Sequence, residues 1–263
     1  MTRFDRDTAV HPVGGGVFEA RVDPGWFVVR GPNGGYVAAM LLRALEAATN
    51  DAARSPRSLT IHYTAPPKEG PVEIRTSVER RGRSLTTVSG RMLQDGRLLA
   101  LTLAAFSKSR EAPSLCETVM PDVPAPRDCP EMASRIPIHE RYEHRPALGV
   151  VPFSGGDRAE TGGWIRLCDG DRPLDAALVA AYADAWPPAV FSRLTQTELA
   201  GGVPTVDLTV HFRQALGSAR GDDFVFAAFR TRRAHEGFLE EDGEIWSRDG
   251  ELLAQSRQLA LIL

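Results

Sequence analysis

The sequence predicts an α+β protein in which one helix-and-sheet unit occurs twice along the chain. An internal repeat is the first observation: Leu59-Thr-Ile-His-Tyr63 returns as Leu208-Thr-Val-His-Phe212, and Gln94-Asp-Gly-Arg-Leu-Leu-Ala100 returns as Arg248-Asp-Gly-Glu-Leu-Leu-Ala254. The second is a helical spacing of apolar residues before the repeated strings, and the third is a series of strand-like runs that contain them. Repeated strings in a fixed order indicate a duplicated unit, here of about 120–130 residues.

An apolar stripe predicts the first helix, which we expect to begin near Asn33. Its apolar residues fall on one helical face, at Val37, Met40, Leu41, Ala44, Leu45 and Ala48. A second helix is expected from about Leu174, because Pro173 suits a helix start. Trp186 ends it, since the residue before a proline avoids the helical region and Pro187 follows.

Runs rich in Val, Ile, Thr and Leu follow each helix and predict antiparallel strands. In the first unit they are Leu59–Tyr63, Val72–Val78, Thr86–Leu93 and Leu98–Phe106. In the second they are Thr205–Phe212, Phe224–Arg230, Gly237–Trp246 and Leu252–Ile262. Shorter strands are expected before the helices, at Val17–Val22 and Gly163–Cys168. A curved sheet wrapped around each helix would bury its stripe, and pairing the two sheets edge to edge would protect their strand edges.

The expected domain organisation has three parts. Residues 1–106 form the first unit, and residues 142–263 form the second unit with the candidate catalytic residues. Between them, residues 107–141 are rich in proline and show little periodicity, so we expect an extended linker that crosses from one unit to the other.

Composition excludes several classes of function. The 263 residues carry a formal net charge of −3 without a run of like charge, so no nucleic-acid partner is expected. Three cysteines without a metal spacing indicate reduced thiols in a cytoplasmic protein, with no metal site. The sequence shows no signal peptide and no membrane span. It also lacks a G-x-S-x-G string, a Walker loop and a dinucleotide signature.

Three polar residues in the second unit are candidates for chemistry. Asp184 extends the small apolar face of the second helix, Thr205 begins a strand, and Gln258 shares a strand face with Ser256 and Ala260. Each also has a plain structural interpretation: a solvated carboxylate at a helix end, a strand former, and an exposed edge glutamine. His62 and His211 occupy matching positions of the repeat, and we expect them to be structural.

The order of these strings resembles the double-hotdog acyl-CoA thioesterases, the relatives of bacterial thioesterase II. Tyr182-Ala183-Asp184 stands at the family's Tyr-Ala-Ser-Asp string, and Thr205-Val206-Asp207 at its Thr-Ile-Asp string. Leu253-Ala254-Gln255-Ser256-Arg257-Gln258 stands at the family's Val-Ala-Ser-Thr-x-Gln string. Asn33-Gly34-Gly35-Tyr36 matches a Phe-Gly-Gly-Gln string only through its glycines, and Leu208 replaces a family histidine. The resemblance implies a tandem hotdog fold and a role in fatty acid metabolism.

By this resemblance the family's catalytic aspartate, threonine and glutamine correspond to Asp184, Thr205 and Gln258. We expect Asp184 to act as a general base on water that Thr205 and Gln258 orient, with attack by Asp184 itself to form an anhydride as a second mechanism. The repeat places Leu42, Pro56 and Ala104 at the corresponding positions of the first unit. The first unit is therefore expected to hold a degenerate site.

The substrate would be an acyl-CoA, with CoA as part of the substrate and no separate cofactor. Backbone amides at Gly34, Gly35 and Tyr36 are expected to bind substrate and the oxyanion, because a helix start favours negative charge. Basic residues at Arg80, Arg81 and Arg83 are either contacts for CoA phosphates or a solvated turn. A non-catalytic acyl-binding protein, a hotdog hydratase or dehydratase, and a structural protein are the alternatives. Further association into a homo-oligomer is expected by analogy with the fold.

Overall fold

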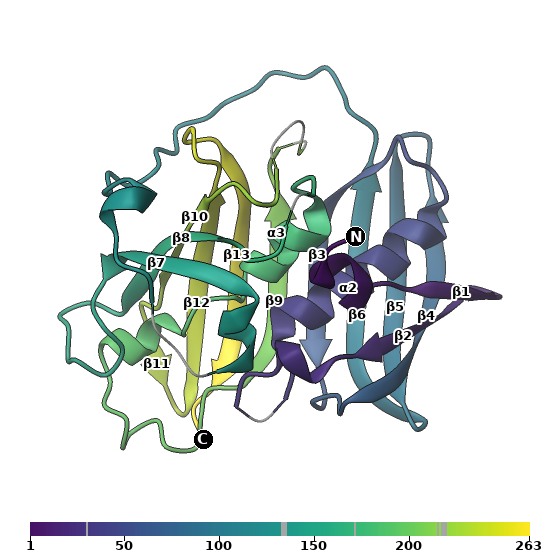
Figure 1. Ribbon diagram of the computed structural model, residues 1–263. Helices are drawn as coiled ribbons and strands as arrows, with labels where there is room; N and C mark the ends of the chain where they lie inside the picture. The colour runs from purple at the N-terminus through teal and green to yellow at the C-terminus, as the bar shows by residue number, and fades with distance from the viewer. Residues whose placement is uncertain (30, 133–135, 171, 215, 217–219) are drawn as a thin grey trace.

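A computed structural model describes residues 1–29, 31–132, 136–170, 172–214, 216 and 220–263. Within them, one 13-stranded antiparallel sheet curves through the molecule (Figure 1). The first half supplies β1 (His11–Gly14), β2 (Val17–Val22), β3 (Ser55–Tyr63), β4 (Gly70–Arg81), β5 (Leu85–Gln94) and β6 (Arg97–Ser107). The second half supplies β7 (Tyr142–Gly149), β8 (Glu160–Leu167), β9 (Thr205–Phe212), β10 (Val225–Arg230), β11 (Ala234–His235), β12 (Phe238–Trp246) and β13 (Leu252–Leu261).

The two halves join where β3 pairs with β9. The strand order is β1-β2-β4-β5-β6-β3 and then β9-β13-β12-β10-β8-β7, so each half keeps its own strands together. Thr60 lies opposite Thr209 in this pair, and their hydroxyl oxygens are 3.1 Å apart. The pairing runs as far as His62 and Asp207. This is the edge-to-edge joint that the sequence predicted, and it leaves no open strand edge between the halves.

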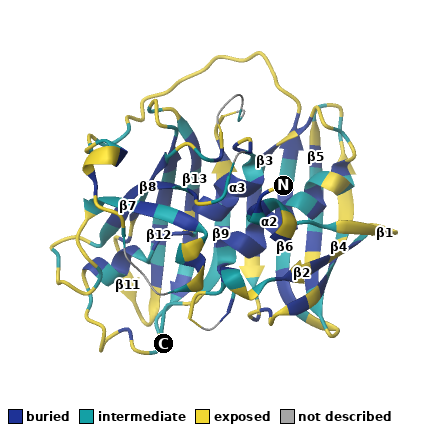
Figure 2. Cartoon of the chain, viewed as in Figure 1, coloured by how far each residue is buried: buried dark blue, intermediate teal, exposed yellow. Residues whose placement is uncertain are grey.

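Each half places a helix against the inner face of the sheet. Helix α2 (Gly34–Thr49) is 16 residues long, and Asn33 caps its start by accepting a hydrogen bond from the Tyr36 amide. Figure 2 shows that the buried surface gathers around α2 and α3 (Ala176–Tyr182). The remaining helical turns are α1 (Arg3–Asp7), η1 (Pro24–Trp26), η2 (Pro126–Asp128), η3 (Pro137–Glu140) and η4 (Ala189–Ser192). Among the described residues, no helix is long and apolar enough to cross a membrane.

The second helix is shorter than the sequence predicted. Helix α3 has 7 residues and ends at Tyr182 instead of continuing to Trp186. The physical reason is a tightening of its last turn: the amides of Asp184 and Ala185 bond to carbonyls three residues back. Asp184 therefore lies just beyond the helix and not on it, so its side chain can turn toward the neighbouring half.

Helices α2 and α3 pack directly against each other, and Gly35 sets how closely they approach. A Cβ atom added at Gly35 would lie 2.3 Å from the Ala181 carbonyl oxygen. Real side chains do not tolerate that distance to a backbone atom, so the contact requires glycine. Gly35 thereby brings the start of one helix against the end of the other.

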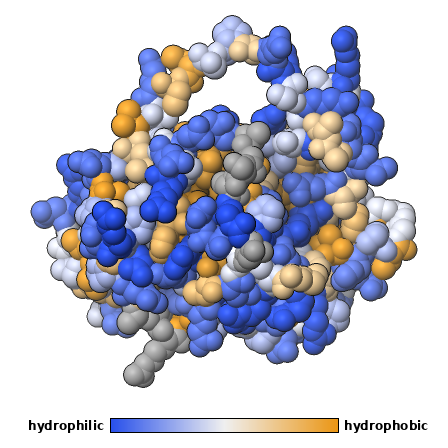
Figure 3. Space-filling view, turned by 45° about the horizontal axis from the view of Figure 1, so that its top comes forward, coloured by the Kyte–Doolittle hydropathy of each residue, from blue (hydrophilic) through white to orange (hydrophobic). Residues whose placement is uncertain are grey.

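The linker crosses the molecule as an arch and then packs against the second half. Residues 108–125 contain no helix or strand and form the arch seen in Figure 1 and Figure 3. At the end of the arch, the Pro124 carbonyl accepts a hydrogen bond from Trp164 Nε1 at 2.8 Å. Cys129 packs with Trp164, Phe226 and Trp246 in a separate apolar cluster. Because neighbouring residues of β10 alternate between this cluster and the main core, the linker covers the sheet face opposite the helices.

We expect Gly35→Ala to lower the free energy of unfolding by about 1–3 kcal/mol, because the helices must separate to admit the methyl group. The matched control is Gly170→Ala, where an added Cβ would meet no atom closer than 3.4 Å. Denaturant titration of both variants makes the comparison. Equal stability of the two variants would show that the close approach at Gly35 is not required.

Candidate active site

Asp184 is held against the start of α2, across the contact between the two halves. The Gly35 amide donates a hydrogen bond to Asp184 Oδ2 at 3.1 Å, and Asn33 Nδ2 donates to the same oxygen at 2.9 Å. Asn33 Nδ2 also donates to the Asp184 backbone carbonyl at 2.5 Å. Asn33 thus caps α2 with its oxygen and anchors Asp184 with its nitrogen, so one side chain fixes both partners.

The surroundings of Asp184 make it a stronger base than an ordinary aspartate. Burial raises the pKa of its carboxyl to about 6, although hydrogen bonds from Gly35, Gly34 and Asn33 act in the opposite direction. A helix start and side-chain donors favour the charged form, whereas removal of water disfavours it. The net result is a carboxylate that is mainly ionised at neutral pH and can still accept a proton.

The hydrogen bonds from Asn33 and Gly35 are both made to Asp184 Oδ2. The Gly34 amide also favours the ionised carboxylate. Asp184 as a whole is partly exposed. The anchored oxygen fixes the orientation of the carboxylate, which can then present Oδ1 to a water molecule or a substrate.

Tyr63, at the end of β3, supports the helix start from the other side. Its hydroxyl donates to the Gly34 carbonyl at 2.8 Å. A Cβ added at Gly34 would lie 2.9 Å from Asp184 Oδ2 and 3.3 Å from the Tyr63 hydroxyl oxygen. Gly34 is therefore enclosed between the carboxylate and the phenol. Burial raises the pKa of Tyr63 well above its usual range, and the charge of Asp184 adds to the effect.

A second polar group lies at the start of β9 and the inner faces of β12 and β13. Thr205 Oγ1 donates to Gln258 Oε1 at 3.0 Å. Gln258 Nε2 donates to Glu241 Oε1 at 2.7 Å, and Glu241 Oε2 accepts a short hydrogen bond from the Ala189 amide. Gln258 is 6% exposed, so the edge-exposed interpretation of this glutamine was wrong.

The structure brings together the expected residues as two groups. Asp184 contacts Gly35, and Thr205 contacts Gln258, but within the described residues no hydrogen bond joins Asp184 directly to Thr205 or Gln258. The two groups are coupled electrostatically, because the charge of Asp184 contributes to the raised pKa of Glu241. That pKa is about 7, with burial as the main cause.

The helix-start amides do not form the free set of oxyanion donors that was expected from the sequence. The Gly35 amide bonds to Asp184 and the Tyr36 amide bonds to Asn33, so these two amides already have acceptors. The Tyr36 side chain is fully buried, stacks on Trp26 and donates its hydroxyl to the Asp7 carbonyl. Tyr36 is therefore a packing residue in this arrangement, whereas Gly34 lies beside Asp184 and its amide favours the ionised carboxylate.

The basic turn considered for CoA lies at the far end of α2. Arg81 donates to the Thr49 carbonyl, at the last residue of a helix about 24 Å long. Because Asn33 and Asp184 lie at the other end, this arginine is distant from the candidate site. That placement favours the solvated-turn interpretation.

The position that corresponds to the site in the first half is built differently. Leu42, Pro56 and Ala104 are buried apolar residues. A cavity of about 580 Å³ opens nearby, with Glu46 and Pro56 in its lining. Burial raises the pKa of Glu46 to about 7. Leu42, Pro56 and Ala104 cannot form a set of aspartate, threonine and glutamine like that of the second half.

Asn33, Tyr63 and Glu241 were not identified as functional residues from the sequence. A clue to Glu241 was present: it shares its strand face with Leu239 and Ile245, and an acid on an apolar face is a candidate for a buried, paired carboxylate. Asn33 precedes a predicted helix and is a common capping residue. Its second bond, to Asp184, depends on tertiary structure and gives no sequence pattern.

Comparison with known proteins identifies the family. Residues 22–107 match the acyl-CoA thioesterase N-terminal domain, and residues 117–262 match the acyl-CoA thioesterase C-terminal domain. The chain belongs to the double-hotdog acyl-CoA thioesterase family. The predicted fold class is confirmed at the level of the hotdog fold, and membership indicates a thioester hydrolase.

Solved structures agree with this assignment. A hotdog protein of unknown function from Alicyclobacillus acidocaldarius is 31% identical, with a TM-score of 0.89 over 99% of this chain and 97% of its own. A candidate thioesterase II from Thermobifida fusca YX is 27% identical, with a TM-score of 0.86 over 100% and 98%. The acyl-CoA thioesterase II TesB2 from Mycobacterium marinum shares the fold at 20% identity, with a TM-score of 0.81 over 99% and 98%.

We expect Asn33→Ser to raise the pKa of Asp184. Serine can still cap α2, but it is too short to donate to Asp184, and losing a hydrogen bond to the charged form raises a carboxyl pKa. The measurement is the pH midpoint of the Asp184 ¹³Cγ resonance in NMR, assigned by its loss in Asp184→Asn. An unchanged or lower midpoint would show that Asn33 does not stabilise the carboxylate.

Proposed function

We propose that the protein hydrolyses acyl-CoA thioesters to a free acid and CoA, with Asp184 as the general base. The observation that carries this proposal is the held carboxylate: the N–H groups of Asn33 and Gly35 anchor Oδ2, and the pKa is raised to about 6. Such a group is ionised at neutral pH and basic enough to take a proton from water. Membership of a thioesterase family supports the reaction class.

In the proposed reaction, Asp184 Oδ1 accepts a proton as the water oxygen bonds to the thioester carbonyl carbon. The Gly34 amide, which lies at the same helix start and in the free protein favours the Asp184 carboxylate, is the proposed donor to the developing oxyanion. The tetrahedral intermediate then collapses, the carbon–sulfur bond breaks and CoA leaves as a thiolate that takes up the proton held by Asp184, which regenerates the carboxylate. Thr205 and Gln258 hold the water in line, so their contribution is orientation. No separate cofactor takes part, and CoA enters as part of the substrate.

The fixed position of the carboxylate favours a general base over a nucleophilic aspartate. Anhydride formation would require Asp184 to approach the thioester carbonyl carbon itself, whereas the bonds from Asn33 and Gly35 tie the carboxylate to the helix start. A base needs only to reach a water molecule, which itself bridges the gap to the carbonyl. The fixed carboxylate therefore supports water activation.

The histidines do not support a hydratase. His62 and His211 are exposed on their strands. His144 is buried, its pKa is lowered to about 3 by burial, and its Nε2 pairs with the Ala185 carbonyl. Among the described residues, no histidine hydrogen-bonds to Asp184, so the pairing of histidine and acid that such chemistry uses is missing.

Asp184→Asn is expected to lower kcat for thiol release from acyl-CoA by about 10²–10⁴-fold, because an amide cannot act as a base. The substituted amide oxygen can keep both hydrogen bonds that Oδ2 accepts, so the geometry is retained. Asp207→Asn, a neutralised acid two residues beyond Thr205, is the control and should leave turnover close to that of wild type. The assay is a free-thiol reaction with acyl-CoAs of different chain length.

The stability of Asp184→Asn shows whether this variant is folded. Because the folded-state pKa of Asp184 is raised above the unfolded value of about 4, its ionisation removes stability as the pH rises from about 4 through about 6. Asp184→Asn should therefore be at least as stable as wild type at pH 8. Full turnover in this folded variant would exclude Asp184 as the base, and acyl-CoA binding by wild type without turnover would identify a binding protein.

A further inference from the structure

Glu241 is a buried carboxyl group that connects the two halves of the candidate site. One of its oxygens accepts from the amide of Ala189, which follows Asp184 by five residues in η4. The other oxygen accepts from Gln258, which in turn bonds to Thr205. Glu241 is 4% exposed, so water cannot replace either bond. The segment that carries Asp184 and the pair that would orient water are therefore tied to one carboxylate.

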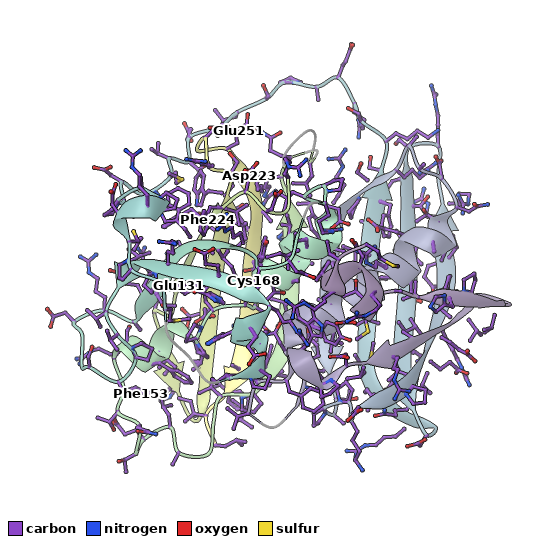
Figure 4. All side chains as sticks on the ribbon, viewed as in Figure 1. Glu131, Phe153, Cys168, Asp223, Phe224 and Glu251 are labelled. Carbon is purple, nitrogen blue, oxygen red and sulfur yellow. The ribbon has the colours of Figure 1, made fainter. Side chains whose placement is uncertain are left out.

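The segment on the Asp184 side is itself anchored. Val190 packs with Leu239 and Ala260 in an apolar cluster. Phe191 stacks on Phe153, with ring centroids 4.9 Å apart, and Figure 4 shows Phe153 at the lower edge of the second half, away from α2. With η4 fixed on both sides, the Ala189 amide is a stationary donor. Because this amide bonds to Glu241 Oε2, Oε1 is the oxygen that accepts a hydrogen bond from Gln258.

Chemistry fixes the direction of this hydrogen-bond chain. An ionised carboxylate can only accept hydrogen bonds, so Gln258 must turn its NH₂ group toward Glu241. The amide oxygen of Gln258 then faces Thr205, and the Thr205 hydroxyl must donate to it. The hydroxyl proton is thereby engaged, and the lone pairs of Thr205 Oγ1 remain available to accept a hydrogen bond from water.

We propose that Glu241 is a positioning residue that sets the polarity of the Glu241–Gln258–Thr205 chain, so that Thr205 presents an acceptor to the water activated by Asp184. The inference rests on the proposed function. A water that gives one proton to Asp184 needs an acceptor for its second proton in order to hold one orientation. Reversing the chain would turn the Thr205 proton outward and remove that acceptor.

The protonation state of Glu241 controls whether the Glu241–Gln258–Thr205 hydrogen-bond chain can reverse its direction. Burial raises the pKa of Glu241 to about 7, with the charges of Asp184 and Glu240 adding to the effect. Bonds from Ala189 and Gln258 favour the ionised form. In the protonated form the carboxyl gains a donor, which can bond to the oxygen of a flipped Gln258 amide.

Glu241→Gln tests the polarity directly. The Ala189 amide still needs an acceptor, so the substituted side chain gives it the oxygen and turns its NH₂ group to Gln258, which must then flip. We expect kcat to fall about 10- to 100-fold, as for other residues that orient catalytic groups, with KM nearly unchanged. The matched control is Glu240→Gln on the same strand, which removes the same charge from a carboxylate that bonds to the Arg232 and Arg233 amides.

A double-mutant cycle with Thr205→Val separates positioning from a general structural effect. If Glu241 acts through Thr205, removing the Thr205 hydroxyl should lower kcat little further in Glu241→Gln, where the hydrogen-bond chain is already reversed. The loss in the double variant should then be smaller than the product of the two single losses by about tenfold or more. Independent, multiplying losses would overturn the proposal.

A structural measurement tests the chain without any turnover. The Gln258 side-chain NH₂ resonances, assigned by their loss in Gln258→Ala, should shift in Glu241→Gln and stay in place in Glu240→Gln. Unchanged Gln258 resonances in Glu241→Gln would refute the amide flip. Absence of thiol release by wild type would refute the proposed function, and with it the catalytic part of this inference, whatever the resonances show.

Discussion

The contact between the start of α2 and the chain just beyond α3 is the constraint on which the rest of the site depends. Asp184 reaches that helix start only because Gly35 lets the two helices approach to backbone contact. Asn33 then joins them through one side chain that caps α2 and holds the carboxylate. Since the two helices belong to different halves, the duplication and the joint between β3 and β9 are what create the site.

Two buried carboxyl groups share this region, and each has a different balance of forces. Asp184 loses water but gains a helix start and an asparagine donor, which keep its pKa near 6. Glu241 is more deeply enclosed and has an amide and a glutamine as partners. Burying acids is costly unless they are hydrogen-bonded, and both carboxyl groups have such partners. The apolar counterparts in the first half, such as Leu42, carry no such cost.

The fold was predictable because it depends on periodic features. The apolar stripe around Val37 predicted α2, and the repeat at Thr60 and Thr209 predicted two equivalent halves. The sequence could not show where α3 ends, because the tight last turn at Asp184 depends on backbone bonding. Alternation placed Gln258 on the strand face of Ser256 and Ala260, but only the structure showed that this face is buried. The bonds of Asn33 and Glu241 could not be predicted, since they join segments far apart in the chain.

The most direct test of the account is the pH dependence of kcat/KM for thiol release from an acyl-CoA. Asp184 must be ionised to accept a proton, and Glu241 must be ionised to hold the chain, so both groups act in the same direction. The account predicts activity that rises with pH, reaches its plateau only above about pH 7, where both carboxylates are ionised, and falls by about tenfold or more per unit below about pH 6. A profile that stays flat down to pH 5 would contradict the account, because turnover would then need neither carboxylate.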